Sequence, residues 1–129
     1  TVKVIAGKFN STEGPVNKHN VQPLYFDVVL NKDKIFDFNL PETHNSFIYL
    51  INGEIKVGEK KHEKITDSKL VLLTKGSKLK VESLIKSNFL LISGKPIGEK
   101  IARGGPFVMN TKAEILEAIN DYHNGTFVK

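Results

Sequence analysis

Residues 47–57, with the sequence FIYLINGEIKV, contain two apolar runs on either side of an Asn52–Gly53 pair. The first run, Phe47 to Ile51, is rich in aromatic and β-branched residues, and the second, Glu54 to Val57, alternates polar and apolar residues. Both patterns are typical of β-strands. Asn-Gly between two such runs is a strong hairpin signal, because a type I′ turn needs positive φ at both central residues. The sequence therefore predicts an antiparallel hairpin over these residues.

Five more short apolar runs lie on either side of this stretch, each next to a turn signal. They are Leu24 to Leu30, Ile35 to Phe38, Leu70 to Leu73, Leu79 to Leu84 and Asn88 to Ile92. The polar residues 31–34 (NKDK) separate the first two runs. Short, closely spaced strands with turn residues between them are typical of an antiparallel sandwich or barrel. No long helix alternates with them, which argues against a doubly wound α/β sheet.

The end of the chain has a helical pattern instead. Thr111 and Glu114 match a capping box, in which the Thr hydroxyl and the Glu carboxylate satisfy free backbone amides at a helix start. Apolar residues then recur at helical spacing, at Ile115, Leu116, Ile119 and Tyr122. Asn124 and Gly125 form a stop signal. The sequence predicts one short amphipathic α-helix over residues 112–123, packed on the barrel or on a neighbouring domain.

Length and composition restrict the class of protein. A chain of 129 residues is long enough for one domain with its own core. It has no cysteine, which excludes disulfides and thiolate ligands and fits a cytoplasmic location. The longest apolar runs are strand-sized, so we expect no contact with a membrane. The chain begins at Thr1 and runs directly into a strand-like stretch, from which we expect a piece of a longer protein or a processed form.

The net charge of +5 raises the question of nucleic-acid binding, but the kind of basic residue argues against it. Eighteen of the nineteen basic residues are Lys, and Arg103 is the only Arg. Reading base edges favours the planar fork of Arg, whereas Lys mainly gives nonspecific attraction to phosphates. The Lys residues are also scattered among Asp and Glu. We therefore expect a solvated, Lys-rich surface and no nucleic-acid partner.

Residues 40–54 (LPETHNSFIYLINGE) resemble the first conserved motif of the cupin barrels. That motif carries a His-x-His pair and a Glu ahead of an apolar strand that ends in Gly, and these side chains converge on one metal ion. With Gly53 set on the glycine of the motif, Ser46 stands at the Glu position. The two His positions then fall within residues 39–42, where no His occurs, and His44 matches neither of them.

The second cupin motif supplies the last His shortly after a Pro-x-Gly turn. Residues 74–76 (TKG) occupy that turn here, and Leu79 stands where the His would be. Both motifs keep their strand and turn residues but lack their ligands. One His cannot hold iron or zinc, which need three or four donors. We therefore expect no metal ligand, cofactor site or catalytic residue in this chain.

The four His residues receive separate interpretations. His62 lies in the charged residues 59–64 and is interpreted as part of a solvated hairpin tip. His19 and His123 lie among polar residues and are interpreted as surface residues. His44 borders the mouth of the expected barrel, which makes it the candidate for a pocket site. A turn-stabilising hydrogen bond is the preferred interpretation of His44.

The tail carries the most specific resemblance. Residues 98–111 (GEKIARGGPFVMNT) resemble the C-terminal signature of the pirin family, in which this segment leads into a final short helix. Residues 93–98 (SGKPIG) are similar to the approach to that signature, and residues 4–7 and 14–16 are similar to the opening of the family's second barrel. The resemblance covers nearly the whole chain.

Pirins are two-barrel cupins, so the resemblance implies both a fold and a partner. It implies that residues 1–129 form the ligand-poor C-terminal barrel, all-β and antiparallel, of the double-stranded β-helix or jelly-roll type, with one short C-terminal α-helix. It also implies that iron is held by His and Glu residues of an N-terminal barrel absent from this chain. Some members of the family have quercetin 2,3-dioxygenase activity, and nuclear members are redox-responsive transcriptional co-regulators.

The tail motif is interpreted as a docking segment in preference to a catalytic one. Paired glycines allow a crowded backbone path, a proline stiffens it, and apolar side chains supply anchors. The candidate inter-domain docking residues are Gly104, Gly105, Pro106, Phe107, Met109 and Asn110. Their expected partner is the N-terminal cupin domain, because exposure of Phe107 and Met109 would be unfavourable.

Three functional hypotheses remain open at this point. The first is a non-catalytic barrel that supports an iron-dependent, dioxygenase-like site in the N-terminal domain. The second is a binding module for a small apolar or aromatic ligand, lined by inward residues of 47–51 and 79–84, although a filled core is the preferred interpretation there. The third is a protein-interaction surface, toward which the +5 charge could steer an acidic partner.

Overall fold

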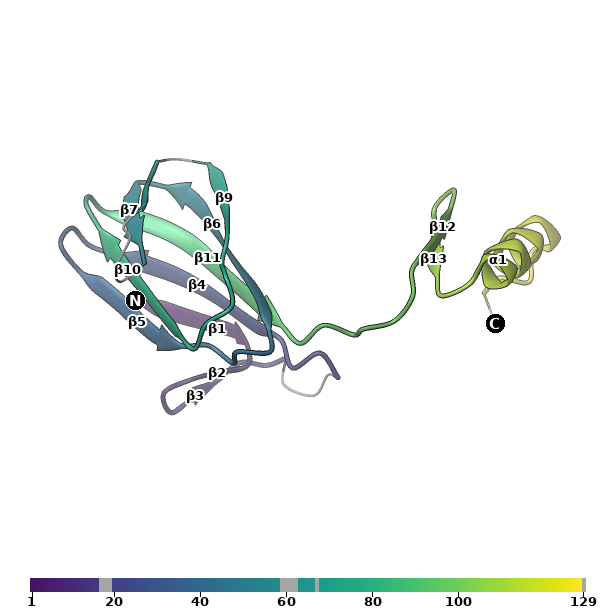
Figure 1. Cartoon of the computed structure of the whole chain (residues 1–129), viewed down its shortest axis with the longest axis horizontal. Helices are drawn as coiled ribbons and strands as arrows, with labels where there is room; N and C mark the ends of the chain where they lie inside the picture. The colour runs from purple at the N-terminus through teal and green to yellow at the C-terminus, as the bar shows by residue number, and fades with distance from the viewer. Residues whose placement is uncertain (17–19, 59–62, 67, 129) are drawn as a thin grey trace. The chain divides into compact units, whose positions relative to one another are not determined.

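The computed structural model describes residues 1–16, 20–58, 63–66 and 68–128. The chain divides into two compact units, Thr1–Pro96 and Ile97–Lys129. The first unit is built from two facing antiparallel β-sheets, and the second contains a β-hairpin and one α-helix (Figure 1). No helix in the described ranges is long and apolar enough to span a membrane.

Each sheet of the first unit mixes strands from distant parts of the chain. The order in the five-stranded sheet is β1 (Val2–Ala6), β4 (Leu24–Leu30), β11 (Ser87–Gly94), β6 (Asn45–Asn52) and β9 (Lys69–Leu72). The order in the four-stranded sheet is β5 (Ile35–Asn39), β10 (Lys78–Ser83), β7 (Glu54–Val57) and β8 (Glu63–Thr66). A small separate hairpin consists of β2 (Lys8–Phe9) and β3 (Thr12–Glu13). The predicted antiparallel pairing is confirmed for all of these strands.

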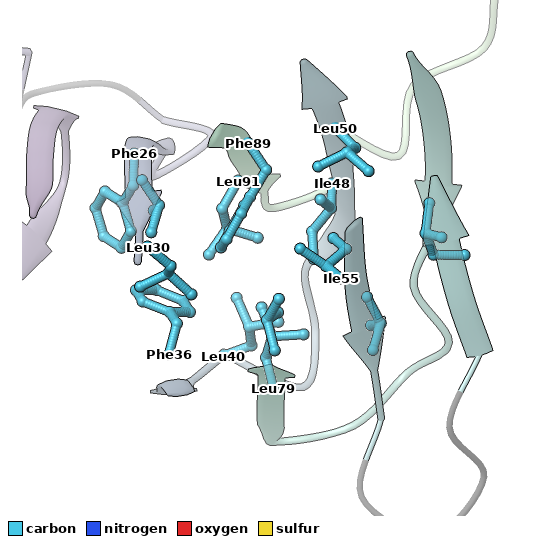
Figure 2. Packing of buried hydrophobic residues seen from close by; sticks show 14 residues of the cluster. Phe26, Leu30, Phe36, Leu40, Ile48, Leu50, Ile55, Leu79, Phe89 and Leu91 are labelled. Carbon is cyan, nitrogen blue, oxygen red and sulfur yellow. The ribbon is translucent and has the colours of Figure 1, made fainter. Parts of the chain in front are cut away.

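The inner faces of the two sheets enclose one hydrophobic core (Figure 2). Strands β4 and β11 point alternate residues into it, including Phe26, Phe89 and Leu91, which are fully buried. The four-stranded sheet contributes Ile55 and Phe36, whose ring meets that of Phe89 edge-on at a centroid distance of 5.8 Å. Burying one side chain of this size contributes about 1.5–3 kcal/mol. Side-chain packing therefore holds the sheets face to face, since no described strand pair joins them by a hydrogen-bonded ladder.

The predicted strands are confirmed, but the predicted hairpin is wrong. Strands β4 and β7 have the predicted bounds. However, β6 belongs to the five-stranded sheet and β7 to the four-stranded sheet, so the two strands do not pair with each other. Gly53 has a positive φ of 101°, whereas Asn52 does not have a positive φ, which excludes a type I′ turn. The Asn52–Gly53 pair marks a crossing between sheets because each strand finds its partners elsewhere in the chain.

Two buried serines hold the backbone where the chain changes sheets. The β4–β5, β6–β7 and β10–β11 connections cross at this end of the unit, and we call Ser83 and Ser87 the serine corner. The Ser83 hydroxyl is hydrogen-bonded to the carbonyl oxygens of Asn31 and Lys34. The Ser87 hydroxyl accepts from the Glu54 NH at 3.1 Å and lies 3.0 Å from the Glu54 carbonyl oxygen. Ser83 therefore links the β10–β11 connection to the β4–β5 connection, and Ser87 links it to the β6–β7 connection.

Gly53 passes directly over the serine corner. A Cβ atom at this position would lie 2.3 Å from Ser87 Oγ and 2.6 Å from Ser87 Cα. Glycine is needed here for two reasons, because the backbone has a positive φ and because it approaches another backbone closely. The glycine that suggested a hairpin thus serves a tertiary contact.

The second unit is a hairpin packed against a helix. Strand β12 (Ala102–Gly104) pairs with β13 (Phe107–Met109), and α1 spans Lys112–Asn124. The predicted capping box is confirmed, because the Glu114 NH donates to Thr111 Oγ1 at 3.2 Å and the Thr111 NH donates to the Glu114 carboxylate at 2.7 Å. Gly125 ends the helix in the left-handed conformation, with φ of 71°.

The apolar stripe predicted for α1 is only partly right. Ile115 and Ala118 are buried and Ile119 is half-buried, whereas Leu116 is 63% exposed and Tyr122 is 66% exposed. Successive residues of a helix point about 100° apart. The narrow β12–β13 hairpin that contacts α1 therefore covers Ile115 and the residues three and four positions later, but not Leu116.

Replacement of Gly53 by Ala is expected to destabilise the first unit strongly. Backbone strain at positive φ is unfavourable by about 1–3 kcal/mol, and the clash with Ser87 adds to it, so we expect the free energy of unfolding to fall by more than about 3 kcal/mol. Gly76→Ala is the matched control, because a Cβ there meets no atom within 4 Å. Urea unfolding followed by circular dichroism measures both. Equal losses for the two variants would contradict the proposed role of Gly53.

Candidate functional site

The metal-ligand positions of the cupin motifs lie at one end of the first unit. Leu79 is in β10, Ser46 is in β6, and residues 39–42 lead from β5 toward β6. The Leu40 NH donates to the Ser77 carbonyl at 2.9 Å, which joins this connection to the segment before β10. Leu40 and Leu79 are buried and lie beside each other in the core (Figure 2). An apolar side chain, Leu79, therefore occupies the position at which the resemblance would place the last imidazole, and Leu40 packs beside it from the stretch that would carry the other two.

His44 lies in the β5–β6 connection and is only 5% exposed. Its Nδ1 atom is 3.1 Å from Ser93 Oγ, and the Ser46 hydroxyl donates to Ser93 Oγ at 2.8 Å. The His44 NH donates to the Pro41 carbonyl at 3.0 Å, and the His44 carbonyl accepts from Lys75 Nζ at 3.2 Å. These bonds fit the interpretation of His44 as a turn-stabilising residue. Its role as a pocket residue stays a prediction.

The surroundings of His44 favour the neutral imidazole. Burial lowers the pKa of His44 below its ordinary value, and the positive charges of Lys75 and Lys95 lower it further. A neutral ring can accept the Ser93 hydroxyl proton at Nδ1. In a Ser-His-Asp triad, Nδ1 of the catalytic His is hydrogen-bonded to a carboxylate. Nδ1 of His44 is instead next to the Ser93 hydroxyl, so His44 does not have the surroundings of a triad base. Sequence reasoning missed Ser93, whose signal is a polar residue at an inward position of the apolar strand β11.

The residues at this end do not fit an iron site. In the parts of the chain that the structure describes, no three His, Cys, Asp or Glu side chains lie together in a way that could hold a metal ion. Ser46 offers a hydroxyl that is already hydrogen-bonded, and Leu79 offers no donor. Of the remaining His residues, His123 is exposed on α1, and His19 and His62 lie outside the described residues.

Two depressions lie in this region of the first unit. The larger, about 420 Å³, is lined mainly by apolar residues that include Leu40 and Leu79. The smaller, about 320 Å³, is lined by residues that include His44 and Lys75. The filled-core interpretation is confirmed for the inward residues of β6 and for Val81, which are fully buried. The larger depression therefore lies at the leucine end of the core and not along β6.

The glycines and the proline of the tail motif shape the β12–β13 hairpin. Gly105 and Pro106 connect the two strands, and Gly105 has a positive φ of 54°. Gly104 lies directly against the helix, since a Cβ there would be 2.4 Å from Ile115 Cγ2. The paired glycines thus permit both the turn and the close approach of α1.

The other candidate docking residues are partly covered within the second unit. Phe107 and Met109 are half-buried, and the Phe107 ring is 5.2 Å from the ring of Phe127. The Asn110 side chain donates to the Glu99 carboxylate at 2.8 Å. The unit itself therefore contributes part of the cover that we expected from a neighbouring domain. Contact of these residues with another domain stays a prediction.

A family model described as the pirin C-terminal cupin domain matches residues 25–128, which is most of the chain. The chain belongs to the pirin family. Among other pirins, the pirin-like protein of Caulobacter vibrioides is 34% identical over 128 residues, which cover 98% of this chain and 45% of that protein. The pirin of Homo sapiens is 35% identical over 127 residues, which cover 96% of this chain and 43% of that protein.

The fold of this pirin domain is also shared with a solved structure. The crystal structure of a quercetin 2,3-dioxygenase from Acinetobacter baumannii matches it with a TM-score of 0.86 and 31% sequence identity, over 98% of this chain and 43% of that one. The two facing antiparallel sheets are therefore a cupin fold. The chain spans about half the length of the curated pirins that it matches.

The stability of this pirin domain is expected to depend on the protonation of His44. The pKa of His44 is lowered in the folded state, so the unfolded chain, with a pKa near 6.5, binds the proton first as pH falls. The free energy of unfolding is therefore highest above pH 6.5 and decreases as pH falls from there through the folded pKa. Urea titrations between about pH 7.5 and 5.5 measure this decrease.

The variant His44→Asn should give a flatter pH profile, because Asn can bond Ser93 but does not titrate. His123→Asn is the matched control, since His123 is exposed on α1. A profile that stays unchanged in His44→Asn would contradict this assignment.

Proposed function

We propose that this chain is a non-catalytic, metal-free cupin barrel that supports an iron-dependent, quercetin 2,3-dioxygenase-like site in a companion N-terminal cupin domain. The observation that carries the proposal is the packing of Leu79, which stands at the position of the last His, in the core beside Leu40, which lies within the 39–42 stretch of the other two His positions. Apolar side chains at these positions add to the core and remove the donors that iron needs. In this proposal, oxygenase chemistry belongs to the companion domain.

The similar proteins support a companion domain and the type of chemistry. A relative from Thermoplasma acidophilum that is 29% identical over 136 residues is named a putative quercetin 2,3-dioxygenase, and this chain covers 51% of its length. The quercetin 2,3-dioxygenase from Acinetobacter baumannii is also longer, because this chain covers only 43% of it. Most connections of the first unit change sheet, which supports a double-stranded β-helix. The absence of cysteine supports the proposed cytoplasmic location.

We assign the tail motif, residues 104–110, to the contact with the companion domain. Val108 is 62% exposed between the half-buried Phe107 and Met109, so an apolar side chain of β13 is available on the side away from α1. The Gly105–Pro106 turn is exposed as well. This tip can reach a neighbouring surface without disturbing the packing of Gly104 on Ile115.

Anaerobic titration of the chain with Fe(II) tests the metal-free proposal. We expect no stoichiometric binding by calorimetry and no turnover of quercetin, because all four His and Glu ligands are missing at the cupin positions. The Acinetobacter baumannii quercetin 2,3-dioxygenase serves as the positive control under the same conditions. One equivalent of tightly bound iron with an octahedral spectroscopic signature would refute the proposal.

A small apolar or aromatic ligand is the second candidate function, and the larger depression favours it. Its volume of about 420 Å³ lies within the range of about 300–1,000 Å³ of ligand pockets, and its lining combines Leu and Val side chains with a few polar and charged ones. Its lining residues include Leu40, Leu79, Val57 and Leu73. A ligand there would bind where other cupins place their metal.

Titration with small aromatic fragments, followed by NMR of backbone amides, tests this second function. We expect shifts concentrated at Leu79, Leu73 and Val57 for a ligand that enters the depression. Leu79→Trp should abolish them, because the larger side chain fills the space. Shifts spread evenly over the surface, or retained in Leu79→Trp, would rule out a pocket at this position.

A further inference from the structure

The smaller depression of the first unit, with a volume of about 320 Å³, has a lining that is part polar and part apolar. Its lining residues are His44, Asn45, Ser46, Leu72, Leu73 and Lys75. The first three belong to the start of β6 and the connection before it, and the others belong to the end of β9 and the segment after it. The Leu73 NH donates to the Ser46 carbonyl at 3.0 Å, which holds these two segments together.

Two hydroxyl groups determine which nitrogen of His44 carries the proton. The Ser46 hydroxyl donates to Ser93 Oγ at 2.8 Å, which leaves the Ser93 hydroxyl to donate its own proton to His44 Nδ1, 3.1 Å away. A neutral imidazole has one N–H group and one acceptor nitrogen. Because Nδ1 is the acceptor in this arrangement, the proton is on Nε2. His44 Nε2 is therefore a hydrogen-bond donor.

This donor has no partner in the part of the chain that the structure describes. The His44 ring makes its hydrogen bond to Ser93 through Nδ1, and no described residue is bonded to Nε2. Every fully buried side-chain nitrogen and oxygen in the described ranges does have a partner, so Nε2 is not fully buried. His44 as a whole is only 5% exposed and lines the smaller depression. Nε2 is therefore the atom of the ring that opens toward this depression.

Lys75 adds a positive charge to the same depression. Its Nζ atom donates to the carbonyl oxygens of Thr43 and His44, each at 3.2 Å, which holds the ammonium group beside the His44 backbone. An ammonium group has three N–H donors, so one of them remains for a ligand. None of the described carboxylates forms an ion pair with Lys75. The depression thus combines a positioned cation that has no counter-ion in the described residues with the N–H group of a neutral ring.

The lining selects an anion that carries an apolar group. Two donors and a positive charge suit the two oxygens of a carboxylate, because hydrogen bonds between charged partners are stronger than those between neutral ones. The leucines on the other side have no polar atom to offer, and Leu72 is 76% exposed. Leu72 and Leu73 also line the larger depression, so apolar surface continues beyond the smaller one. A hydrophobic body attached to the carboxylate would cover this surface.

We propose that the depression at His44 and Lys75 is a binding site for a small organic acid. Its carboxylate accepts hydrogen bonds from His44 Nε2 and Lys75 Nζ, and its aromatic or aliphatic body lies against Leu72 and Leu73. The site goes beyond the proposed function, because it needs neither iron nor the companion domain. It also differs from the second candidate function, because charge selects its ligand.

Binding of a carboxylate is expected to raise the pKa of His44. In the free chain, burial and the positive charges of Lys75 and Lys95 lower this pKa. A carboxylate beside Nε2 favours the imidazolium form, in which both nitrogens donate, and the Ser93 hydroxyl can accept from Nδ1. By linkage, the acid binds more tightly as pH falls from about 7.5 to 6, a range in which a carboxylate with a pKa near 4 stays ionised.

Titration of the 129-residue chain with benzoate tests the site. NMR of the backbone amides and of the His44 ring nitrogens locates the binding and measures the pKa of His44. Benzamide has the same ring without the charge, and acetate has the same charge without the ring. We expect saturable shifts at His44, Ser46 and Leu73 with benzoate, a higher pKa of His44 in the complex, and dissociation constants at least about tenfold larger for benzamide and acetate.

Two Lys variants separate the site from the general positive charge of the chain. Lys75→Gln should weaken benzoate binding about tenfold, because Gln can donate to the same carbonyl oxygens but carries no charge. Lys86→Gln is the matched control, since it removes the same charge from an exposed position in the β10–β11 connection, and should change binding less than about twofold. Circular dichroism shows whether each variant is folded. If Lys75→Gln unfolds, the comparison of benzoate with benzamide in the unsubstituted chain decides.

Four outcomes would overturn the proposal. Benzamide that binds as tightly as benzoate would show that charge does not select the ligand, and acetate that binds as tightly would show that the leucines contribute nothing. Equal binding by Lys75→Gln and Lys86→Gln would place the carboxylate elsewhere. No saturable shift with benzoate in the millimolar range would refute the site. None of these results bears on iron, so the Fe(II) titration tests the proposed function separately.

Discussion

The serine corner is the constraint on which the first unit depends. Where the chain leaves one sheet for the other, backbone amides and carbonyls lose their ladder partners inside a nearly dry core. A buried group left without a partner is unfavourable by about 1–3 kcal/mol. Ser83 and Ser87 supply hydrogen bonds at these crossings, and the missing side chain of Gly53 lets the backbone come close enough to reach Ser87. Two small polar residues thus allow three crossings without an open gap in the core.

At the opposite end of the unit, hydrogen bonds between side chains also pair the buried polar groups. Buried polar groups there are again paired, in the chain of Ser46, Ser93 and His44. Of the positions assigned to metal ligands by the resemblance, Ser46 is part of this network and Leu79 is packed in the core. Packed leucines and hydrogen bonds between neutral side chains thus occupy the end of the barrel at which other cupins bring several metal ligands together. A depression of about 420 Å³ lies beside these leucines.

The two sheets share one core but differ in what they present outward. Charged residues occupy much of the outer face of the four-stranded sheet, whereas apolar rows run across β11, β6 and β9 of the five-stranded sheet. The second unit has a comparable asymmetry, because α1 buries Ile115 and Ala118 against its hairpin and leaves Leu116 exposed. In both units the apolar surface exceeds what the unit itself can bury.

Local patterns by themselves determined most strands of the two main sheets, the capped helix, the family and the lack of ligand residues at the cupin positions. β4, β7 and α1 end within one residue of their predicted bounds, because propensity, capping and turn chemistry act over a few neighbouring residues. Tertiary structure alone decided that β6 and β7 separate into different sheets and that Ser93 joins His44. These features depend on contacts between distant residues, such as Ser46 and Ser93, which are 47 positions apart. A local sequence pattern has no information about partners at that distance.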